Sequence, residues 1–467
     1  MLNTAVLVAL PGVNLNKTDP RRVRIWDMAV VLAYGSPALG HLYPMCPLLS
    51  ELVGRGHDVH LRTLSDGLAT GRRLGVQTAC VNPRIEDIAG EDWTAGNAFG
   101  VLKMTIDVLC HRAALEVGDL AAAIDQVHPD ALIIDANCWG AMSAADAGTT
   151  PWSVFSPFTP FLQSPGTPPF GPGLAPWPGL AGRFRDAGVR AVVRRVMDGP
   201  MLPRVNAIRA SVGAPEVRSV DEFFRRPPLT LVASGKPFEY PQTHWGDTVH
   251  MIGPCAFEPA PAVPDWLATI DRPIVLVTTS SIRQADTRLA LTALTALADE
   301  PVHMVVTFPA GVPDGVVAPA NATVRRFVPH GAVLDRTICA VTHGGMGTTQ
   351  KALSRGVPVC AVPFARDQAE VARRVEVARC GTRLPAKKLT PQRLRAKVRQ
   401  AMTMADGARR VAEGFAATGG VARGAELIEQ RLLGEEGAQE PDALPRRRRI
   451  RAAEPPHPFA GGHGTRR

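Results

Sequence analysis

The segment CAVTHGGMGTTQKALSRGVPVCAVPFARDQ, residues 339–368, carries the strongest structural signal in the chain. It contains an apolar run, a turn with three glycines between His343 and Gly347, a segment of helical composition, a second apolar run and an acidic turn. Glycine can adopt positive φ and lets the backbone come close to a ligand. The first amides of the following helix lack partners within the helix and attract anions. The segment therefore predicts a strand, a phosphate-binding turn and a helix.

Polar side chains stand at both ends of this segment. His343 and Thr348 would add a ring N–H and a hydroxyl to the turn, which suits a diphosphate. Asp367 and Gln368 follow the apolar run 357–362, where the next parallel strand should end. Ligands of open α/β sheets bind at such carboxyl ends. From the glycines alone, a plain tight turn with a buried histidine is an equal alternative.

Two further polar residues, His41 and Asp135, follow apolar runs nearer the start of the chain. His41 ends the loop 35–41 and meets a helix-like segment, 42–55, whose N-terminus we expect to lower the pKa of the imidazole and keep it neutral. Asp135 ends the apolar run 130–135, and the carboxyl ends of parallel strands converge on one crevice. The alternative is that both residues are helix caps.

The hydrophobic pattern alternates strand-like and helix-like segments through both halves of the chain. This pattern is typical of parallel sheets with crossover helices, and 467 residues suit two domains. Strands are expected at 29–33, 58–63, 130–135, 229–233, 274–279, 302–308, 323–328 and 357–362.

The motifs H-G-G-x-G-T-T, G-V-P and P-x-x-x-D-Q of residues 343–368 resemble the nucleotide-sugar signature of the inverting glycosyltransferases of family one, which include actinomycete antibiotic glycosyltransferases. Gly40, His41 and Pro44 resemble the G-H-x-x-P motif of the catalytic histidine in that family. The resemblance implies an α/β GT-B fold, with two Rossmann-like domains whose parallel sheets face a central cleft. It also implies that His41 is a general base oriented by Asp135.

The resemblance assigns a donor-binding role to a second group of residues. Ser281 would contact phosphate, Phe327 and His330 the nucleobase and ribose, and Asp367 and Gln368 the sugar hydroxyls. The residues implied for the diphosphate are His343, Gly344, Gly345, Gly347 and Thr348.

Three positions depart from the family pattern. Ser280 stands where a glycine is usual, and Phe327 replaces a tryptophan. Lys351 stands where many relatives have a glutamate that holds the ribose hydroxyls, and a lysine has only donors. A dTDP-linked donor is therefore an alternative beside a UDP-linked one.

The expected domain organisation follows from composition and from the resemblance. The extension 1–27 breaks the hydrophobic pattern, so either it is loose or translation starts at Met28. The remaining parts are an acceptor-binding domain at 28–252, a proline-rich linker at 253–270, a nucleotide-sugar domain at 271–405, C-terminal helices at 406–433 with the last returning to the first domain, and a disordered basic tail at 434–467.

Two segments between the motifs have unusual composition. Segment 151–184 has nine prolines up to Pro178 and several aromatic residues, which predicts a long loop that forms an apolar acceptor wall, with a disordered linker as the alternative. Segment 183–209 is basic and amphipathic. Weak peripheral membrane contact is compatible with it, but a solvated helix face is favoured.

Charge and cysteine content exclude several classes of function. Most of the net charge of +9 lies in 1–27 and 446–467, so the body of the chain is near neutral and is not expected to bind nucleic acid. The eight cysteines are scattered without a C-x-x-C pair, which indicates a reducing, cytoplasmic location and no zinc site. No D-x-D triplet is present, so no metal and no cofactor beyond the nucleotide sugar are expected.

The resemblance implies transfer of a hexose or deoxyhexose, with inversion, to a hydroxyl of an apolar acceptor such as a polyketide, macrolide, phenolic compound or lipid. The alternatives are a nucleotide-sugar epimerase or another enzyme of the same fold, and a non-catalytic partner of a true transferase. The retained constellation of His41, Asp135 and His343 argues for chemistry over a non-catalytic role.

Overall fold

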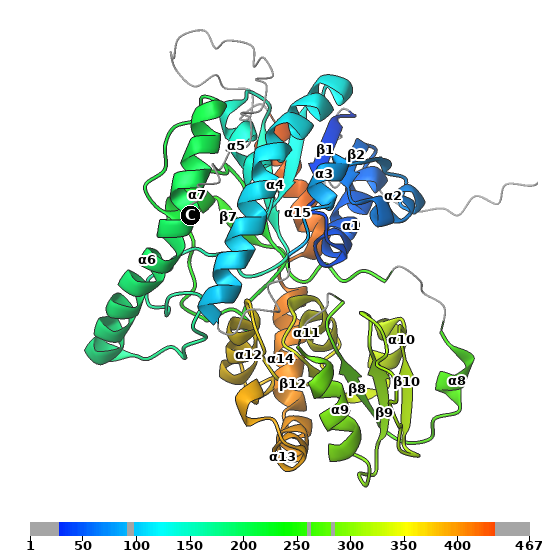
Figure 1. The fold of residues 1–467 in the computed structure, drawn as a ribbon. Coiled ribbons are helices and arrows are strands. Elements are labelled where there is room, and N and C mark those ends of the chain that lie inside the picture. Colours follow the sequence, from blue (N-terminus) through cyan, green and yellow to red (C-terminus); the bar gives the residue numbers. More distant parts are fainter. Residues whose placement is uncertain (1–27, 91–97, 259–262, 282–284, 435–467) are drawn as a thin grey trace, which may run out of the picture.

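Two parallel sheets, one in each half of the chain, form the frame of the protein (Figure 1). The structure is a computed structural model that describes residues 28–90, 98–258, 263–281 and 285–434. The N-terminal extension and nearly all of the basic tail lie outside the described residues. The α/β class and the GT-B arrangement expected from the sequence are confirmed.

In the first half, the described residues form a seven-stranded sheet in the order β3-β2-β1-β4-β5-β6-β7, with all neighbouring strands parallel. Its elements are β1 (Val30–Tyr34), α1 (Leu39–Gly54), β2 (Asp58–Thr63), η1 (Ser65–Gly67), α2 (Leu68–Arg73), β3 (Gln77–Cys80), α3 (Pro83–Glu86), α4 (Ala98–Val127), β4 (Ala131–Asp135), α5 (Trp139–Ala147), β5 (Trp152–Ser156), α6 (Gly179–Ser211), α7 (Val220–Phe224), β6 (Thr230–Val232) and β7 (Val249–Met251).

In the second half, the described residues form a six-stranded parallel sheet in the order β10-β9-β8-β11-β12-β13. Its elements are α8 (Asp265–Ala268), β8 (Ile274–Thr278), α9 (Thr287–Ala296), β9 (His303–Thr307), β10 (Ala322–Arg325), α10 (His330–Leu334), β11 (Thr337–Thr342), α11 (Met346–Leu353), β12 (Val359–Ala361), α12 (Gln368–Val377), β13 (Gly381–Arg383), η3 (Ala386–Lys388), α13 (Pro391–Met402), α14 (Ala405–Ala416), α15 (Gly420–Ile428) and the π-helical turn η4 (Glu429–Leu433).

Helices cover both faces of each sheet, and the strand sequences show why. Successive side chains of a strand point to opposite faces. In β1, Leu32 and Tyr34 join the core beneath α4 and α5, whereas Val31 and Ala33 join the core beneath α1 and α15. A strand that is buried on both faces must be apolar at every position, as the run VVLAY is.

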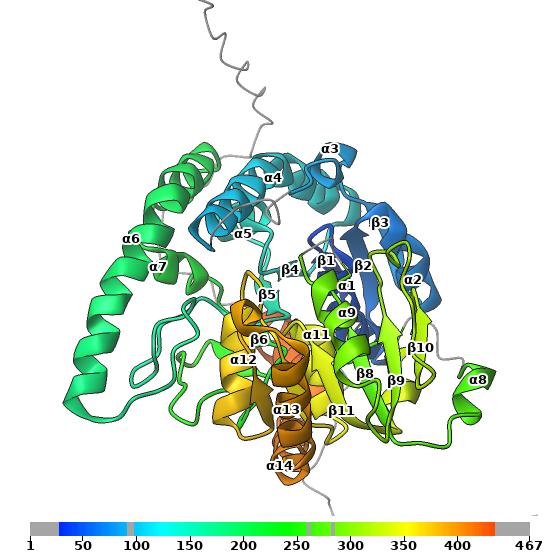
Figure 2. The same cartoon turned by 60° about the horizontal axis from the view of Figure 1, so that its bottom comes forward.

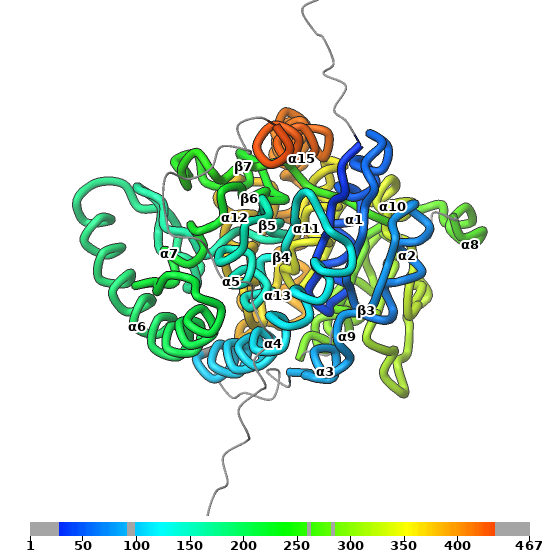
Figure 3. Tube along the Cα trace, turned by 90° about the horizontal axis from the view of Figure 1, so that it is seen from above, coloured from blue at the N-terminus to red at the C-terminus, as the bar shows by residue number. Residues whose placement is uncertain are grey.

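The last helix leaves the second half and packs on the first. Seen from above, α15 lies beside α1 (Figure 3). Its apolar residues Ala425, Leu427 and Ile428 are part of the first-half core. Glu429 follows, 4% exposed, and accepts hydrogen bonds from Arg55 Nη1 at 2.8 Å and His57 Nε2 at 3.2 Å. Apolar packing of α15, together with the Glu429 carboxylate bound by Arg55 and His57, therefore holds α15 and η4 on the first half.

Several expected elements differ from those observed. Segment 151–184 is not one loop, because β5 occupies its start and α6 its end; the true loop is 157–178, called the aromatic loop below. The C-terminal helices expected over 406–433 are present as α14, α15 and η4, and Gly419, which adopts a left-handed conformation with φ +86°, separates α14 from α15. The short helix α8 lies inside the stretch expected to be linker.

Helix α6 stands at the side of the molecule and is exposed along much of its length (Figures 1 and 2). Phe184 and Leu180 in its first turns are 76% and 68% exposed. Among the described residues, no helix combines the length and apolar character that a membrane-spanning segment requires.

The contact of Glu429 with the first half makes a stability prediction. Replacing Glu429 with alanine leaves Arg55 and His57 without their shared carboxylate, and we expect a loss of about 2 kcal/mol of unfolding free energy. Thermal unfolding should show a melting temperature lowered by several degrees.

The matched control for this prediction is Glu426, which lies three residues earlier, in α15. Glu426 pairs with Arg423, but both side chains are more than 40% exposed, so Glu426→Ala should change the unfolding free energy by no more than about 0.5 kcal/mol. Equal melting temperatures for the two variants would show that Glu429 does not anchor the chain end.

Candidate functional site

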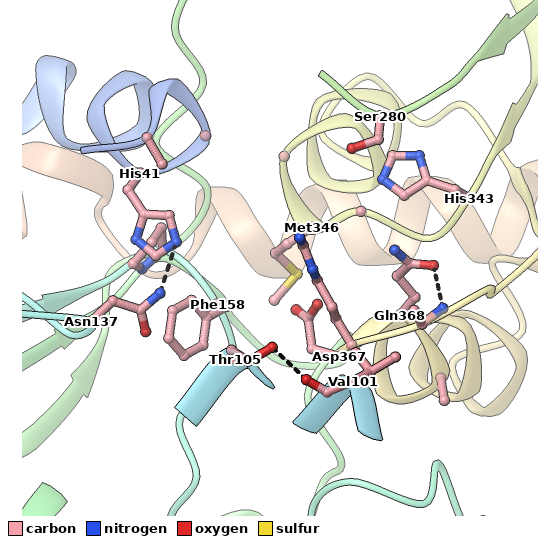
Figure 4. A pocket seen from close by; sticks show the side chains of 18 of the residues that line it. His41, Val101, Thr105, Asn137, Phe158, Ser280, His343, Met346, Asp367 and Gln368 are labelled. Atoms are coloured by element: carbon pink, nitrogen blue, oxygen red, sulfur yellow. Dashed lines mark hydrogen bonds between the residues drawn. The ribbon is translucent and has the colours of Figure 1, made fainter. Parts of the chain in front are cut away.

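The two halves enclose one large cleft where the carboxyl ends of their strands meet. Its volume is about 1520 Å³, and its lining comes from both halves. His41 and Asn137 lie on one side, and His343, Asp367 and Gln368 on the other (Figure 4). Residues more than 200 positions apart in sequence therefore share a single cavity, as expected at the carboxyl ends of parallel strands.

His41 and Asp135 are in direct contact on the first-half side. Helix α1 begins two residues before His41, so the histidine lies in the first turn, and Asp135 is the last residue of β4. His41 Nδ1 lies 2.9 Å from both Asp135 carboxylate oxygens. Asn137 adds two contacts: its backbone N–H donates to Asp135 at 2.9 Å, and its Nδ2 lies 3.2 Å from His41 Nε2.

The charge state of His41 differs from the expectation. Burial lowers the pKa of His41, but the Asp135 carboxylate and its hydrogen bond raise it by more, so the pKa lies above 6.5. The helix N-terminus was expected to lower the pKa, and that prediction is wrong, because a fully buried carboxylate at 2.9 Å outweighs the partial charge of a helix end.

The glycine turn follows β11 and begins α11. Gly344 adopts φ +87°, a conformation that strongly favours glycine. A Cβ on Gly345 would lie 2.3 Å from His343 Nε2, so this glycine makes room for the imidazole itself. A Cβ on Gly347 would meet no atom within 4 Å, and this residue, with Thr348, lines the open cleft at the start of α11.

His343 is buried at the end of β11, and burial, with a contribution from Arg366, lowers its pKa to about 4. Among the described residues its Nδ1 has no hydrogen-bond partner, since Asp286 Oδ2 is 3.6 Å away. Burial raises the pKa of Asp286. His343 is therefore a neutral ring at pH 7 that can donate a hydrogen bond without carrying charge.

Asp367 and Gln368 form the start of α12 on the same side. Gln368 Oε1 accepts hydrogen bonds from the backbone N–H groups of Phe364 and Ala365, at 2.8 and 3.1 Å, and so shapes the turn. Burial raises the pKa of Asp367, and its carboxylate is one of the charges that raise the pKa of His41. Asp367 is thus close enough to His41 to interact across the cleft.

The other residues that were expected to bind the donor also line the cleft. His330 begins α10; burial and Lys351 lower its pKa to about 4, and its Nε2 lies 3.3 Å from the Thr307 hydroxyl. Phe327 is 55% exposed, with its ring open to the cleft. Ser281 also lines the cleft, beside Ser280, whose backbone N–H donates to Asp286 at 2.6 Å.

Lys351 has an unexpected partner. Its Nζ lies 3.0 Å from Oε1 of Glu258, a residue of the segment between the two halves. Both side chains line the cleft near His330 and Phe327. Glu258 therefore places a carboxylate beside Lys351, the position at which a glutamate was expected from the family pattern.

The first-half wall of the cleft is largely apolar. Helices α4 and α6 line it with Leu102, Ile106, Val193 and Met197. The aromatic loop adds a run of rings that begins beside His41: the centroids of His41 and Phe158 are 5.7 Å apart, those of Phe158 and Phe161 5.9 Å, and those of Phe161 and Phe170 4.8 Å. This wall suits a large apolar acceptor.

Two residues of the site were not found from the sequence. Asn137 carried a weak signal, because it comes two residues after the strand-end carboxylate of Asp135. Glu258 carried none, because it lies in a proline-rich linker and reaches Lys351 only through the fold.

Comparisons with known proteins agree with this geometry. The profile of the erythromycin biosynthesis protein CIII-like C-terminal domain matches residues 290–423. The 4'-demethylrebeccamycin synthase of Lentzea aerocolonigenes is 30% identical over 420 residues, which is 86% of this chain and 99% of that protein. The demethyllactenocin mycarosyltransferase of Streptomyces fradiae is 26% identical over 422 residues, 86% of each protein. The solved structure of the kitacinnamycin glycotransferase has a TM-score of 0.67 at 25% identity and covers 87% of this chain and 100% of that chain.

The similarities to the two relatives and to the solved structure extend over both halves of the chain, so they include the walls of the cleft as well as the glycine turn. The first relative is aligned over almost its whole length at 30% identity. The motifs, the two facing sheets and the relatives lead to one assignment: the chain belongs to the family-one glycosyltransferases of actinomycete natural-product biosynthesis.

Proposed function

We propose that this glycosyltransferase is metal-independent and inverting, and that it moves a hexose or deoxyhexose from a UDP- or dTDP-linked donor to a hydroxyl of an apolar polyketide, macrolide, phenolic compound or lipid. The observation that carries the proposal is the His41–Asp135 pair, which faces Asp367 and the glycine turn across one cleft. No cofactor beyond the nucleotide sugar is needed for this reaction.

His41 serves as the general base through Nε2. Its Nδ1–H donates to Asp135, a tautomer that leaves the lone pair of Nε2 beside the Asn137 amide. As the acceptor oxygen attacks C1 of the sugar, its proton moves to Nε2 and the C1–O bond to the diphosphate breaks with its electron pair. Attack from the face opposite the leaving group inverts C1. Asp135 stabilises the imidazolium that forms.

The glycine turn stabilises the diphosphate as it leaves the sugar. The free amides at the start of α11, the Thr348 and Ser281 hydroxyls and the neutral His343 ring are donors for the developing charge on the diphosphate. These donors support metal independence, because they supply the stabilisation that a cation would otherwise provide. Asp367 and Gln368 bind sugar hydroxyls, and Phe327 stacks on the base with His330 at its edge.

The two alternatives are less well supported. The contact between His41 and Asp135 requires burial of the Asp135 carboxylate, which costs desolvation free energy. A non-catalytic partner would gain nothing from this contact. An epimerase would convert its donor without an acceptor, and the large apolar wall beside His41 would then have no role. Product analysis with and without an acceptor separates these functions.

The first prediction from this mechanism concerns His41. His41→Ala should lower sugar transfer by about 10²- to 10⁴-fold, because the acceptor hydroxyl loses its base. The affinity for UDP and dTDP, measured by calorimetry, should stay within about twofold, because binding of the nucleotide does not use His41. Transfer is measured with a panel of phenols, macrolide aglycones and phenolic lipids, with EDTA present, and the anomer of the product is assigned by NMR.

Three outcomes would contradict the proposal. Transfer by the variant at the parental rate would remove His41 from the role of base. Loss of wild-type activity in EDTA would contradict metal independence. A product that keeps the donor anomer would contradict inversion.

The second prediction concerns pH. The base must be neutral to act, so kcat/KM should rise with pH through the pKa of His41, which Asp135 raises above 6.5. Asp135→Asn removes the negative charge and leaves burial, which lowers the pKa, so the acidic limb should move to lower pH while the plateau falls. A pH profile of kcat/KM for both proteins measures the shift; an unmoved limb would show that another group titrates.

The third prediction concerns the nucleotide. We propose that the Glu258 carboxylate, held by Lys351, accepts hydrogen bonds from the ribose hydroxyls. Wild type should then bind UDP about 10- to 100-fold more tightly than dUDP, which lacks only the 2′-hydroxyl. Glu258→Gln should reduce that ratio, and dTDP isolates the effect of the base methyl. Equal UDP and dUDP affinities in wild type would rule out this role for Glu258.

A further inference from the structure

The aromatic loop of the first half is fastened to helix α12 of the second. Glu370 Oε1 accepts the backbone N–H groups of Gly171 at 2.8 Å and Gly173 at 2.7 Å. Arg373 Nε donates to the carbonyl oxygen of Gly173 at 2.8 Å. Two neighbouring side chains of α12 therefore bind both the donor and the acceptor group of one loop residue.

A buried charge cluster holds Glu370 in place. Arg374 binds Glu370 at 2.8 Å and also binds Glu239 at 2.7 Å, a residue that follows β6 in the first half. Glu370, Arg374 and Glu239 are 2%, 5% and 0% exposed. Glu239 also accepts hydrogen bonds from the hydroxyls of Thr159 and Ser234. Because every charge in the cluster is paired, the cluster favours one position of the loop.

The fit between loop and helix also depends on a glycine. Gly173 has φ +62° and is buried against α12. A Cβ at this position would lie 2.5 Å from the carbonyl oxygen of Ala369, a backbone atom that cannot move without shifting the helix. A side chain at position 173 would therefore push the loop away from α12.

A line of aromatic rings runs from this contact to His41. The Arg374 guanidinium lies 6.0 Å from the Phe170 ring centroid, and Phe170 packs on Phe161. Phe161 packs on Phe158, which packs edge-on against His41. Because these rings line the cleft beside the base, a shift of the loop on α12 would displace the wall that an acceptor contacts.

We propose that Glu370, Arg373 and Arg374 form an α12 latch that positions the acceptor wall. They are positioning residues: they act through the aromatic loop and place the acceptor hydroxyl at His41 only while the loop is docked on the donor-binding half. The inference rests on the proposed function, because it takes the aromatic loop to be the acceptor wall and His41 to be the base. It predicts that undocking the loop weakens acceptor use and leaves nucleotide binding intact.

The experiment compares Gly173→Ala with Gly166→Ala. Gly166 lies in the same loop with φ +76°, but a Cβ there would meet only Gln242, at 3.6 Å, so it carries similar backbone strain without a clash on α12. With the best acceptor of the panel, Gly173→Ala should lower kcat/KM by about 10²-fold, mainly through KM for the acceptor. Gly166→Ala should stay within about threefold of wild type, and both variants should bind UDP with the wild-type dissociation constant.

A second measurement needs no acceptor and no activity. Amide hydrogen exchange of the full chain should show the N–H groups of Gly171 and Gly173 protected in wild type and in Gly166→Ala. In Gly173→Ala, the protection at residue 171 should be lost while that of β11 is kept.

The outcomes separate the latch from the proposed function. Rapid exchange at 171 and 173 in wild type, or equal acceptor kinetics in the two variants, would overturn the latch. Absence of sugar transfer by wild type to every acceptor would count against the proposed function, and hydrogen exchange would still decide whether the loop is docked. If Gly173→Ala fails to fold, Arg373→Ala, which removes the bond to the Gly173 carbonyl oxygen from a partly exposed side chain, must show the exchange and KM changes for the latch to stand.

Discussion

The parallel direction of every strand in both sheets is the constraint on which the site depends. Parallel strands place all their carboxyl ends, and the loops that follow them, at one edge of a sheet. Here the two edges face each other, so the residues after β1 and β4 meet those after β8, β11 and β12 in one cleft. His41 and Asp367 therefore line the same cleft from opposite sides (Figure 4).

The pKa values of the two histidines, His41 and His343, are shifted in opposite directions because their surroundings differ. His41 has a carboxylate at 2.9 Å, which outweighs burial and raises its pKa. His343 has no carboxylate within hydrogen-bond distance among the described residues, so burial dominates and lowers its pKa to about 4. The first environment stabilises a cation that forms as a proton arrives, and the second preserves a neutral donor.

Two of the contacts between the described parts of the halves run in opposite directions. Helix α15 returns to the first sheet and anchors there through apolar packing and Glu429. The aromatic loop reaches in the opposite direction and docks on α12 through Glu370. The first contact fixes α15 and η4 on the first half, and the second joins the aromatic loop to α12 of the second half.

The sequence alone determined most of the strands, the glycine turn and the candidate residues at strand ends, because these depend on local periodicity and on glycine chemistry within a few residues. The strands β3, β5, β7 and β13 were not predicted, and β5 lies in a segment that was expected to be a loop. The long helix α4 and its share of the acceptor wall were not predicted. The pKa of His41, the partner of Lys351 and the docking of the aromatic loop were decided only by tertiary structure. Each depends on groups distant in the chain, 94 residues apart for His41 and Asp135 and 199 for Gly171 and Glu370. Electrostatic energies and hydrogen bonds depend on distance in space, which local sequence does not contain.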